Sequence, residues 1–95
     1  MGILKDKIFL SENLQQQGIE LGNIINSEPN ILEVYLIFNK NFEGNVLVKI
    51  KGETNIEIGR SSISINQKEG EAGYFKFTFD ALTNADGKSN NIYVE

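Results

Sequence analysis

The residues best suited to chemistry in this sequence are acidic side chains that recur at short spacings. Three such pairs are Glu53 with Glu57, Glu69 with Glu71, and Asp80 with Asp86. Two carboxylates can share general acid and general base work in hydrolysis when burial raises the pKa of one of them. Each pair lies in a turn or on the polar side of an alternating segment, where carboxylates are hydrated. We therefore predict no catalytic residue among them and no enzyme activity.

A second candidate is the loop from Asp80 to Ser89, whose side-chain oxygens suit calcium. The possible ligands are Asp80, Asn84, Asp86 and Ser89. Acidic calcium loops place such ligands at fixed positions and end on a bidentate Glu. The required leading Asp and the closing Glu are missing here, and Asn, Asp, Gly and Ser also form ordinary turns. The prediction is a turn with no metal and no cofactor, and calcium binding at this loop stays an open question.

Other routes to catalysis lack their residues. The chain of 95 residues has no Cys, His or Trp, which excludes disulfides, thiolate zinc sites, Cys nucleophiles and His-dependent triads. Ser61 and Ser62 follow Arg60 but match no nucleophile motif, and the sequence has no Gly-rich phosphate loop.

The charge balance and the apolar runs restrict the partners. With 9 basic and 13 acidic residues, the net charge is -4, which argues against binding to nucleic acid phosphates. No apolar run approaches the roughly 18–20 residues of a membrane span, and residues 1–7 lack the features of a signal peptide. We expect no membrane insertion, and a reducing compartment or a particle assembled in one.

Alternation of apolar and polar residues dominates from the middle of the chain onward. It is clearest in segments 46–51, 56–58, 63–65, 75–79 and 92–94. Successive side chains of a strand point to opposite faces of a sheet, so this period of two predicts strands. Phe75, Phe77 and Phe79 are expected to lie in the core rather than to form a stacking platform.

The segment from Ile31 to Phe38 differs because one of its faces is apolar and the other is largely apolar too. Leu32, Val34, Leu36 and Phe38 form one face, and Tyr35 and Ile37 the other. Such a strand is usually central or covered on both sides. Tyr35 and Ile37 are expected to lie under a loop, under the N-terminal arm or in a subunit interface, with coverage by the chain itself favoured.

The connections between these segments are short. We predict turns at Asn39–Gly44, with Gly44 at positive φ, and at Gly52–Asn55. Gly59–Ser61 is expected to form a bulge or a crossing between sheets. Asn66–Gly73 is expected to be a polar loop, and Leu82–Asn91 the longest connection of the C-terminal half.

Residues 1–30 are interpreted as an N-terminal arm or edge strands. Ile8–Leu10 is a short candidate strand, and Ser11–Gln17 forms either a loop or a helical turn capped by Ser11 and closed by Gly18. Ile19 and Leu21 suggest a further short strand. The sequence therefore predicts one all-β domain over residues 1–95, a small sandwich of about seven or eight short, mostly antiparallel strands.

The stretch from Ile31 to Phe79, with its Phe42–Ile50 hairpin and its Phe75–Phe79 strand, resembles small immunoglobulin-like β-sandwich modules. Small, acidic, Cys-free domains of this kind resemble accessory or decoration proteins of phage virions. The Cys…Trp…Cys signature of antibody domains is absent, which excludes that subfamily. The resemblance implies a structural or binding module that docks on a capsid or tail, located in the host cytoplasm during assembly and then in the virion.

Aromatic residues that are out of phase with the core, or that lie in a turn, are the candidate partner-binding anchors. They are Tyr35, Phe42, Tyr74 and Tyr93. Exposed aromatics often mark contact sites, although Phe42 has the alternative of folding back to cap one end of the domain. The expected partner is a protein assembly or a second copy of the chain. The alternatives are a carbohydrate-binding or adhesion module using Tyr74 and Tyr93, and an acidic inhibitor protein.

Overall fold

The computed structural model describes residues 7–28, 30–52, 56–79 and 91–95. These residues form seven strands and one short helix. In chain order the elements are β1 (Ile8–Leu10), α1 (Glu12–Gln16), β2 (Ile19–Glu28), β3 (Ile31–Phe38), β4 (Phe42–Lys51), β5 (Glu57–Gln67), β6 (Ala72–Thr78) and β7 (Asn91–Val94).

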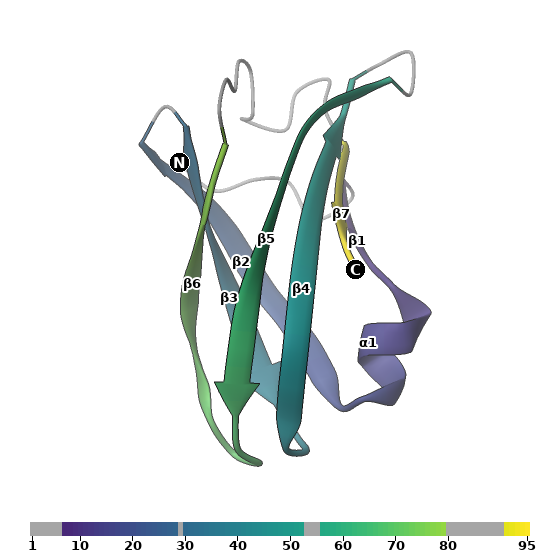
Figure 1. Ribbon diagram of the computed structural model, residues 1–95, viewed down its shortest axis with the longest axis vertical. Helices are drawn as coiled ribbons and strands as arrows, with labels where there is room; N and C mark the ends of the chain where they lie inside the picture. Colours follow the sequence, from purple (N-terminus) through teal and green to yellow (C-terminus); the bar gives the residue numbers. More distant parts are fainter. Residues whose placement is uncertain (1–6, 29, 53–55, 80–90) are drawn as a thin grey trace.

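The strands form two sheets that pack face to face as a sandwich (Figure 1). One sheet has the order β1-β7-β4-β5 and the other has the order β2-β3-β6. All strand pairs are antiparallel except β1 with β7, which joins the two ends of the chain in parallel. The prediction of a small all-β sandwich is confirmed.

The core lies between the sheets and follows from the alternation along each strand. Leu32, Val34, Leu36 and Phe38 of β3 are fully buried, and they face Val46, Val48 and Ile50 of β4. Phe77 and Phe79 are buried beside them and Phe75 is partly buried against the cluster, so the expectation for the three phenylalanines is confirmed. Burying each such side chain contributes about 1.5–3 kcal/mol, which makes this parity the main determinant of strand register.

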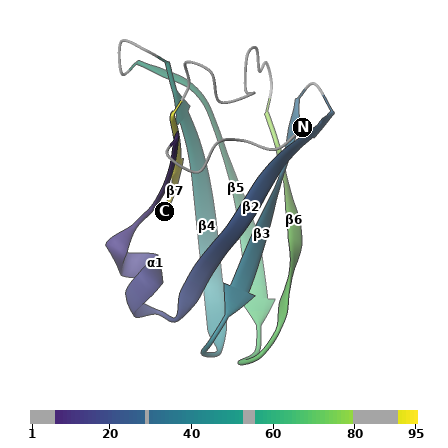
Figure 2. The ribbon, with the colours of Figure 1, turned by 180° about the vertical axis from the view of Figure 1, so that it is seen from behind.

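The outer face of β3 is largely apolar, with Tyr35 and Ile37 beside Glu33. β3 is central in its sheet, between β2 and β6, as the doubly apolar pattern predicts. Tyr35 and Ile37 are half-buried by side chains of the neighbouring strands. Among the described residues no third layer lies over this face (Figure 2), and β1 pairs with β7 of the other sheet rather than covering it. The favoured expectation, coverage by a loop or the N-terminal arm, therefore finds no support in the described part of the chain.

The connection after β3 differs from the turn predicted at Asn39–Gly44. β3 and β4 belong to different sheets, so Asn39–Asn41 crosses the sandwich, and Gly44 lies within β4 without a positive φ. The prediction for Gly44 is wrong because Phe42 is buried and the extended strand begins there. The described glycines with positive φ are Gly18, which ends α1, and Gly70, in the turn before β6.

The N-terminal elements agree with one of the two alternatives left open. Ser11 caps α1, since its Oγ accepts a hydrogen bond from the Leu14 N–H at 3.3 Å, and Gly18 closes the turn with φ of 86°. Ile8–Leu10 forms an edge strand. β2 is longer than expected and has two register shifts.

Two further expectations concern segments of the C-terminal half. β5 runs unbroken through Gly59–Ser61, where a bulge or a crossing is expected. The register shift with β4 lies one residue earlier on β5: Ile50 is opposite Gly59 and Lys51 is opposite Glu57, so the pairing skips Ile58. The polar loop after β5 is shorter than predicted, because Asn66 and Gln67 belong to β5, and Ala72 and Gly73 belong to β6. The turn beyond Gly52 and the 80–90 connection, including the calcium candidate, lie outside the described residues.

Candidate partner-binding surfaces

The first surface is built around two tyrosines on the outer face of the three-stranded sheet. Tyr35 and Tyr74 are directly opposite on β3 and β6, and their rings meet edge to face with centroids 4.9 Å apart. The Tyr74 hydroxyl donates a hydrogen bond to Asn23 Oδ1 on β2 at 3.0 Å. A Cβ at Gly22 would lie 2.6 Å from the Tyr35 ring, so the glycine leaves the space in which the ring lies. We call these residues, with Ile37, the tyrosine surface.

The tyrosine surface combines order with exposure. Tyr74 is 47% exposed although its ring and hydroxyl are both held by neighbours. An aromatic side chain that is already ordered loses little conformational entropy when a partner covers it, and tyrosine offers a large apolar face with a polar end. This geometry suits contact with a protein surface.

The second surface lies on the outer face of the four-stranded sheet, on the other side of the sandwich. Tyr93 of β7 stacks on Phe9 of β1, with centroids 5.1 Å apart and ring planes 19° apart. The Lys51 ammonium group lies 5.0 Å from the Tyr93 ring centroid, within the range of a cation–π contact. Tyr93 is therefore already in contact with two neighbours of its own chain, and the more exposed ring of the pair is Phe9, at 44%.

Phe42 does not belong to either surface. It is the first residue of β4, is 5% exposed, and its ring lies 6.0 Å from that of Phe38. The prediction that Phe42 is an exposed anchor is wrong, and the alternative, that its ring folds back to close one end of the core, is confirmed. The polar residues around Phe42 in the sequence concealed this, because they occupy the exposed positions of the crossing and of β4.

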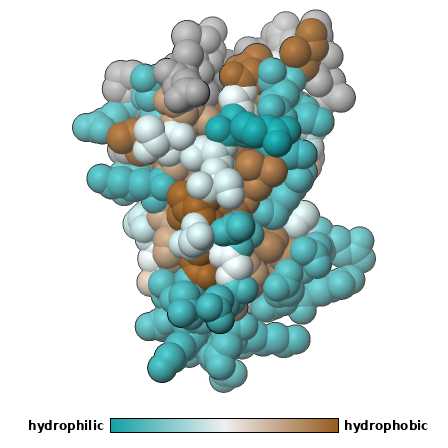
Figure 3. Space-filling model, in the orientation of Figure 1, coloured by the Kyte–Doolittle hydropathy of each residue, from teal (hydrophilic) through white to brown (hydrophobic). Residues whose placement is uncertain are grey.

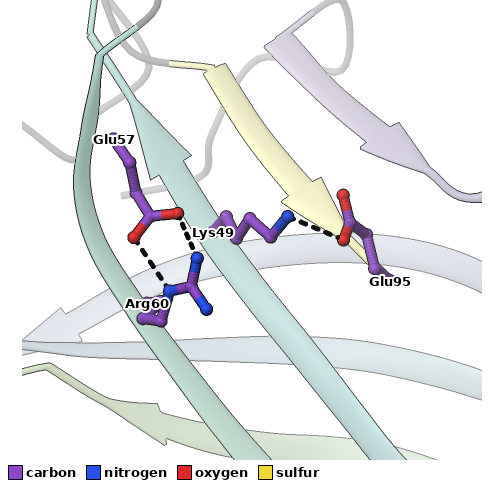
Figure 4. A network of polar contacts seen from close by, with 4 residues as sticks. All are labelled: Lys49, Glu57, Arg60 and Glu95. Carbon is purple, nitrogen blue, oxygen red and sulfur yellow. Dashed lines mark hydrogen bonds and ion pairs between the residues drawn. The ribbon is translucent and has the colours of Figure 1, made fainter.

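Charged side chains surround the second surface as two separate ion pairs (Figure 4). Lys49 Nζ lies 3.0 Å from Glu95 Oε1, and Arg60 donates two hydrogen bonds, of 2.8 and 2.7 Å, to the Glu57 carboxylate. Lys51 is opposite Glu57 in register, but the Glu57 carboxylate is paired with Arg60 of its own strand. The hydrogen bonds from Arg60 hold the pKa of Glu57 below its usual value, with further attraction from the charges of Arg60, Lys49 and Lys51. A lowered pKa is the opposite of what a general acid requires.

Glu69 and Glu71, another of the three acidic pairs, lie in the connection between β5 and β6. Glu71 Oε1 accepts a hydrogen bond from the Lys68 N–H at 2.6 Å, and Glu69 donates its own N–H to Asn41 Oδ1 at 2.8 Å. Among the residues the structure describes, no three acidic side chains lie close enough together to hold a metal ion. Glu53, Asp80 and Asp86 are outside that part of the chain.

Open hollows lie on the described part of the surface, and two of them share no lining residue. One, of about 460 Å³, is lined by Leu10, Gln15, Gly18–Leu21 and Asn39, where α1 joins β2. The other, of about 310 Å³, is lined by Glu43–Asn45 and Ser64–Asn66 at the end of the β4–β5 pair. The Ser64 hydroxyl donates to Asn45 Oδ1 there, and neither hollow gathers reactive side chains.

Two residues of the second surface, Phe9 and Lys51, are not predicted as binding residues from the sequence. Their position depends on the parallel pairing of Phe9 with Tyr93, between opposite ends of the chain. The only sequence signal is parity, since Phe9 lies between two inward-facing residues of β1, Ile8 and Leu10, which pack against the core.

Comparison of the chain with protein-family models, with curated proteins and with solved structures found no match. In the described residues no helix has the length and apolar character needed to cross a membrane.

Proposed function

We propose that this chain is a non-catalytic binding module that docks on a larger protein assembly through the tyrosine surface. The observation that carries the proposal is the exposed Tyr74 ring, held by Tyr35 and Asn23 on the outer face of the three-stranded sheet. The most concrete form is an accessory protein of a phage capsid or tail, which passes from the host cytoplasm to the virion.

The strand order supports the immunoglobulin-like part of this proposal. In such domains one sheet has the order A-B-E, and the other places C beside F, with G beyond F and C′ beyond C. β2, β3 and β6 correspond to A, B and E, and β5, β4 and β7 correspond to C′, C and F. β1 takes the position of G but runs parallel to its neighbour. Because one fold serves many functions, the tyrosine surface and not the fold carries the functional argument.

The carbohydrate alternative is less well supported. Sugar stacking requires a free aromatic face, whereas Tyr93 already contacts Phe9 and Lys51. The Tyr74 ring contacts the Tyr35 ring, and its hydroxyl donates to Asn23. The acidic-inhibitor alternative needs carboxylates concentrated on one face, but two of them, Glu57 and Glu95, are paired with cations.

The test uses virions purified from the source of the gene, with the chain supplied as wild type, Tyr74→Ser or Tyr93→Ser. We expect wild type and Tyr93→Ser to sediment with the particles. The amount of Tyr74→Ser that sediments should be lower by about tenfold or more, as for an interface hot spot. Tyr93→Ser is the matched control because it removes the same side chain from the opposite side of the sandwich. Failure of the wild-type chain to bind particles, or equal binding of all three chains, would overturn the proposal. A glycan array that detects binding dependent on Tyr74 would favour the carbohydrate alternative.

A further inference from the structure

The four edge strands of the sandwich differ in how well they are protected against pairing with another strand. β1 has only three residues, β2 is interrupted by two register shifts, and β6 carries Lys76 in its middle. Shortness, bulges and charges all hinder edge-to-edge pairing. β5 has eleven residues, and its register with β4 is unbroken from Gly59 to Gln67. It is therefore the most open edge among the described strands.

The hydrogen bonds of β4 show which backbone groups of β5 face outward. Leu47 and Glu95 exchange two backbone hydrogen bonds of 2.8 Å, so the N–H and C=O of Leu47 point toward β7. Ser62, directly opposite Leu47 on β5, then has its own groups directed away from β4. By the alternation of an antiparallel ladder, Arg60, Ser64 and Asn66 do the same. These four residues form a row of donors and acceptors along the free edge.

Along residues 62–66 of this edge, uncharged polar side chains alternate with isoleucines. Residues 61–66 carry no charge, and the Arg60 guanidinium is paired with Glu57 of its own strand. Ile63 on β5 and Phe75 on β6 are only partly buried, each at the margin of the core. Figure 3 shows apolar side chains along the middle of the face on which β5 and β6 lie. A strand added to β5 would cover this margin.

We propose that two copies of the chain pair antiparallel through their β5 edges, about a two-fold axis at Ile63. In this register Ile63 is opposite Ile63 of the second copy, Ser62 is opposite Ser64, and Arg60 is opposite Asn66. The outward-facing residues then form the hydrogen-bonded pairs, and the two isoleucines form a non-hydrogen-bonded pair in which side chains approach closely. A register centred on Arg60 would place two guanidinium groups opposite each other, which is unfavourable.

The charge pattern of β5 favours a second copy over a foreign strand. The free edge offers no net charge by which an acidic or basic partner would be selected, and its Ser–Ile alternation is complementary to itself. A two-fold pairing also forms a closed dimer, because the β5 edge of each copy is then occupied and no third copy can be added through it. Each copy carries a net charge of -4, so the dimer dissociation constant should fall as added salt screens the repulsion between the copies. The dimer does not depend on the tyrosine surface, which lies on the outer face of the other sheet.

The first test is disulfide trapping, which is clean because the chain has no native cysteine. The Cα atoms of a non-hydrogen-bonded pair are about 4.5 Å apart, within the range of a disulfide. Ile63→Cys should cross-link under mild oxidation at least about tenfold faster than Ser62→Cys, whose thiols are out of register. Ser62→Cys is a stringent control because its thiol is more exposed to random collision. Equal rates, or faster cross-linking of Ser62→Cys, would overturn the register.

The second test is sedimentation equilibrium of three chains over a range of concentration and salt. Ser62→Pro removes an outward N–H without removing a bond of the β4–β5 ladder, so it should fold and raise the dimer dissociation constant at least about tenfold. Ser62→Thr keeps the N–H and should dimerise like wild type. Circular dichroism checks the fold of each variant. A wild-type chain that stays monomeric at millimolar concentration, or a dimer that persists in folded Ser62→Pro, would overturn the proposal.

Discussion

The ring of Phe42 closes one end of the core, while that of Tyr74 lies on the surface, and substitution should separate the two roles. Phe42→Ala leaves a cavity beside Phe38, so we expect it to lower the free energy of unfolding by about 3–5 kcal/mol. Tyr74→Ala loses one ring contact and one exposed hydrogen bond, so the expected loss is about 1 kcal/mol. Urea unfolding at constant pH measures both. Similar losses for the two variants would contradict the assignment of Phe42 to the core.

The Glu57–Arg60 pair makes a prediction about pH. Because Arg60 lowers the pKa of Glu57 in the folded chain, the pair stabilises the fold above the unfolded pKa of Glu57, and this contribution is lost as the pH falls through the folded pKa. The effect should be small, since both side chains are exposed to solvent. Carboxyl carbon NMR titration should show the pKa of Glu57 rising toward its ordinary value in Arg60→Gln. An unchanged pKa would mean that another group lowers it, and Lys76→Gln, on the other sheet, is the control.

At the scale of elements, the two described glycines with positive φ provide a matched pair. A Cβ at Gly18 would lie 2.8 Å from Lys40 Cγ, whereas nothing lies within 4 Å of a Cβ at Gly70. Gly70→Ala should cost about 1–2 kcal/mol for the left-handed backbone alone, and Gly18→Ala should cost more. Gly73→Ala, in open space on β6, has neither penalty and is the control. Thermal unfolding of the three variants tests this order, and a larger loss for Gly70→Ala than for Gly18→Ala would contradict it.

The elements also show what the sequence can and cannot predict. Parity along β3 predicted which of its residues are buried, and the Ser11 cap and Gly18 predicted α1, because these features depend on near neighbours in the chain. The sequence does not reveal that the chain crosses between the sheets after β3, since a short polar connection between two alternating segments fits either a hairpin or a crossing. Which sheet receives β4 depends on its pairing with β5 and β7, and no local pattern contains that information.

The same limit applies to the candidate site. Tyr35 and Tyr74 were selected as out of phase with the core, and the structure brings them together. Their contact depends on the β3–β6 register, which pairs strands distant in sequence. Gly22, which leaves the space for Tyr35, carries no local signal at all. Sequence reasoning thus selects the tyrosines that lie outside the core but cannot group them with their neighbours.

At the scale of the whole molecule, the two proposed interactions use different sheets. The three-stranded sheet presents the tyrosine surface on its outer face, and the four-stranded sheet presents the β5 edge. A β5-paired dimer would therefore leave both tyrosine surfaces free and make the module bivalent. Bivalent docking strengthens binding to a repetitive assembly without any new contact, provided that the spacing of its sites matches the dimer.

The closure of the sandwich by β1 leads to a final prediction about folding. β1 has three residues and pairs with β7 across the full length of the chain, so forming this contact closes the longest loop for the least burial. We expect it to form after the rate-limiting step, which places Leu10 among the residues with low φ-values. Leu10→Ala should then leave the folding rate within about twofold of wild type and raise the unfolding rate by about 5–30-fold. Val48→Ala, in the centre of the core where β4 meets β5 and β7, should instead slow folding. Stopped-flow chevron plots of the two variants separate these effects, and a folding rate lowered by Leu10→Ala as much as by Val48→Ala would show that β1 pairs with β7 early.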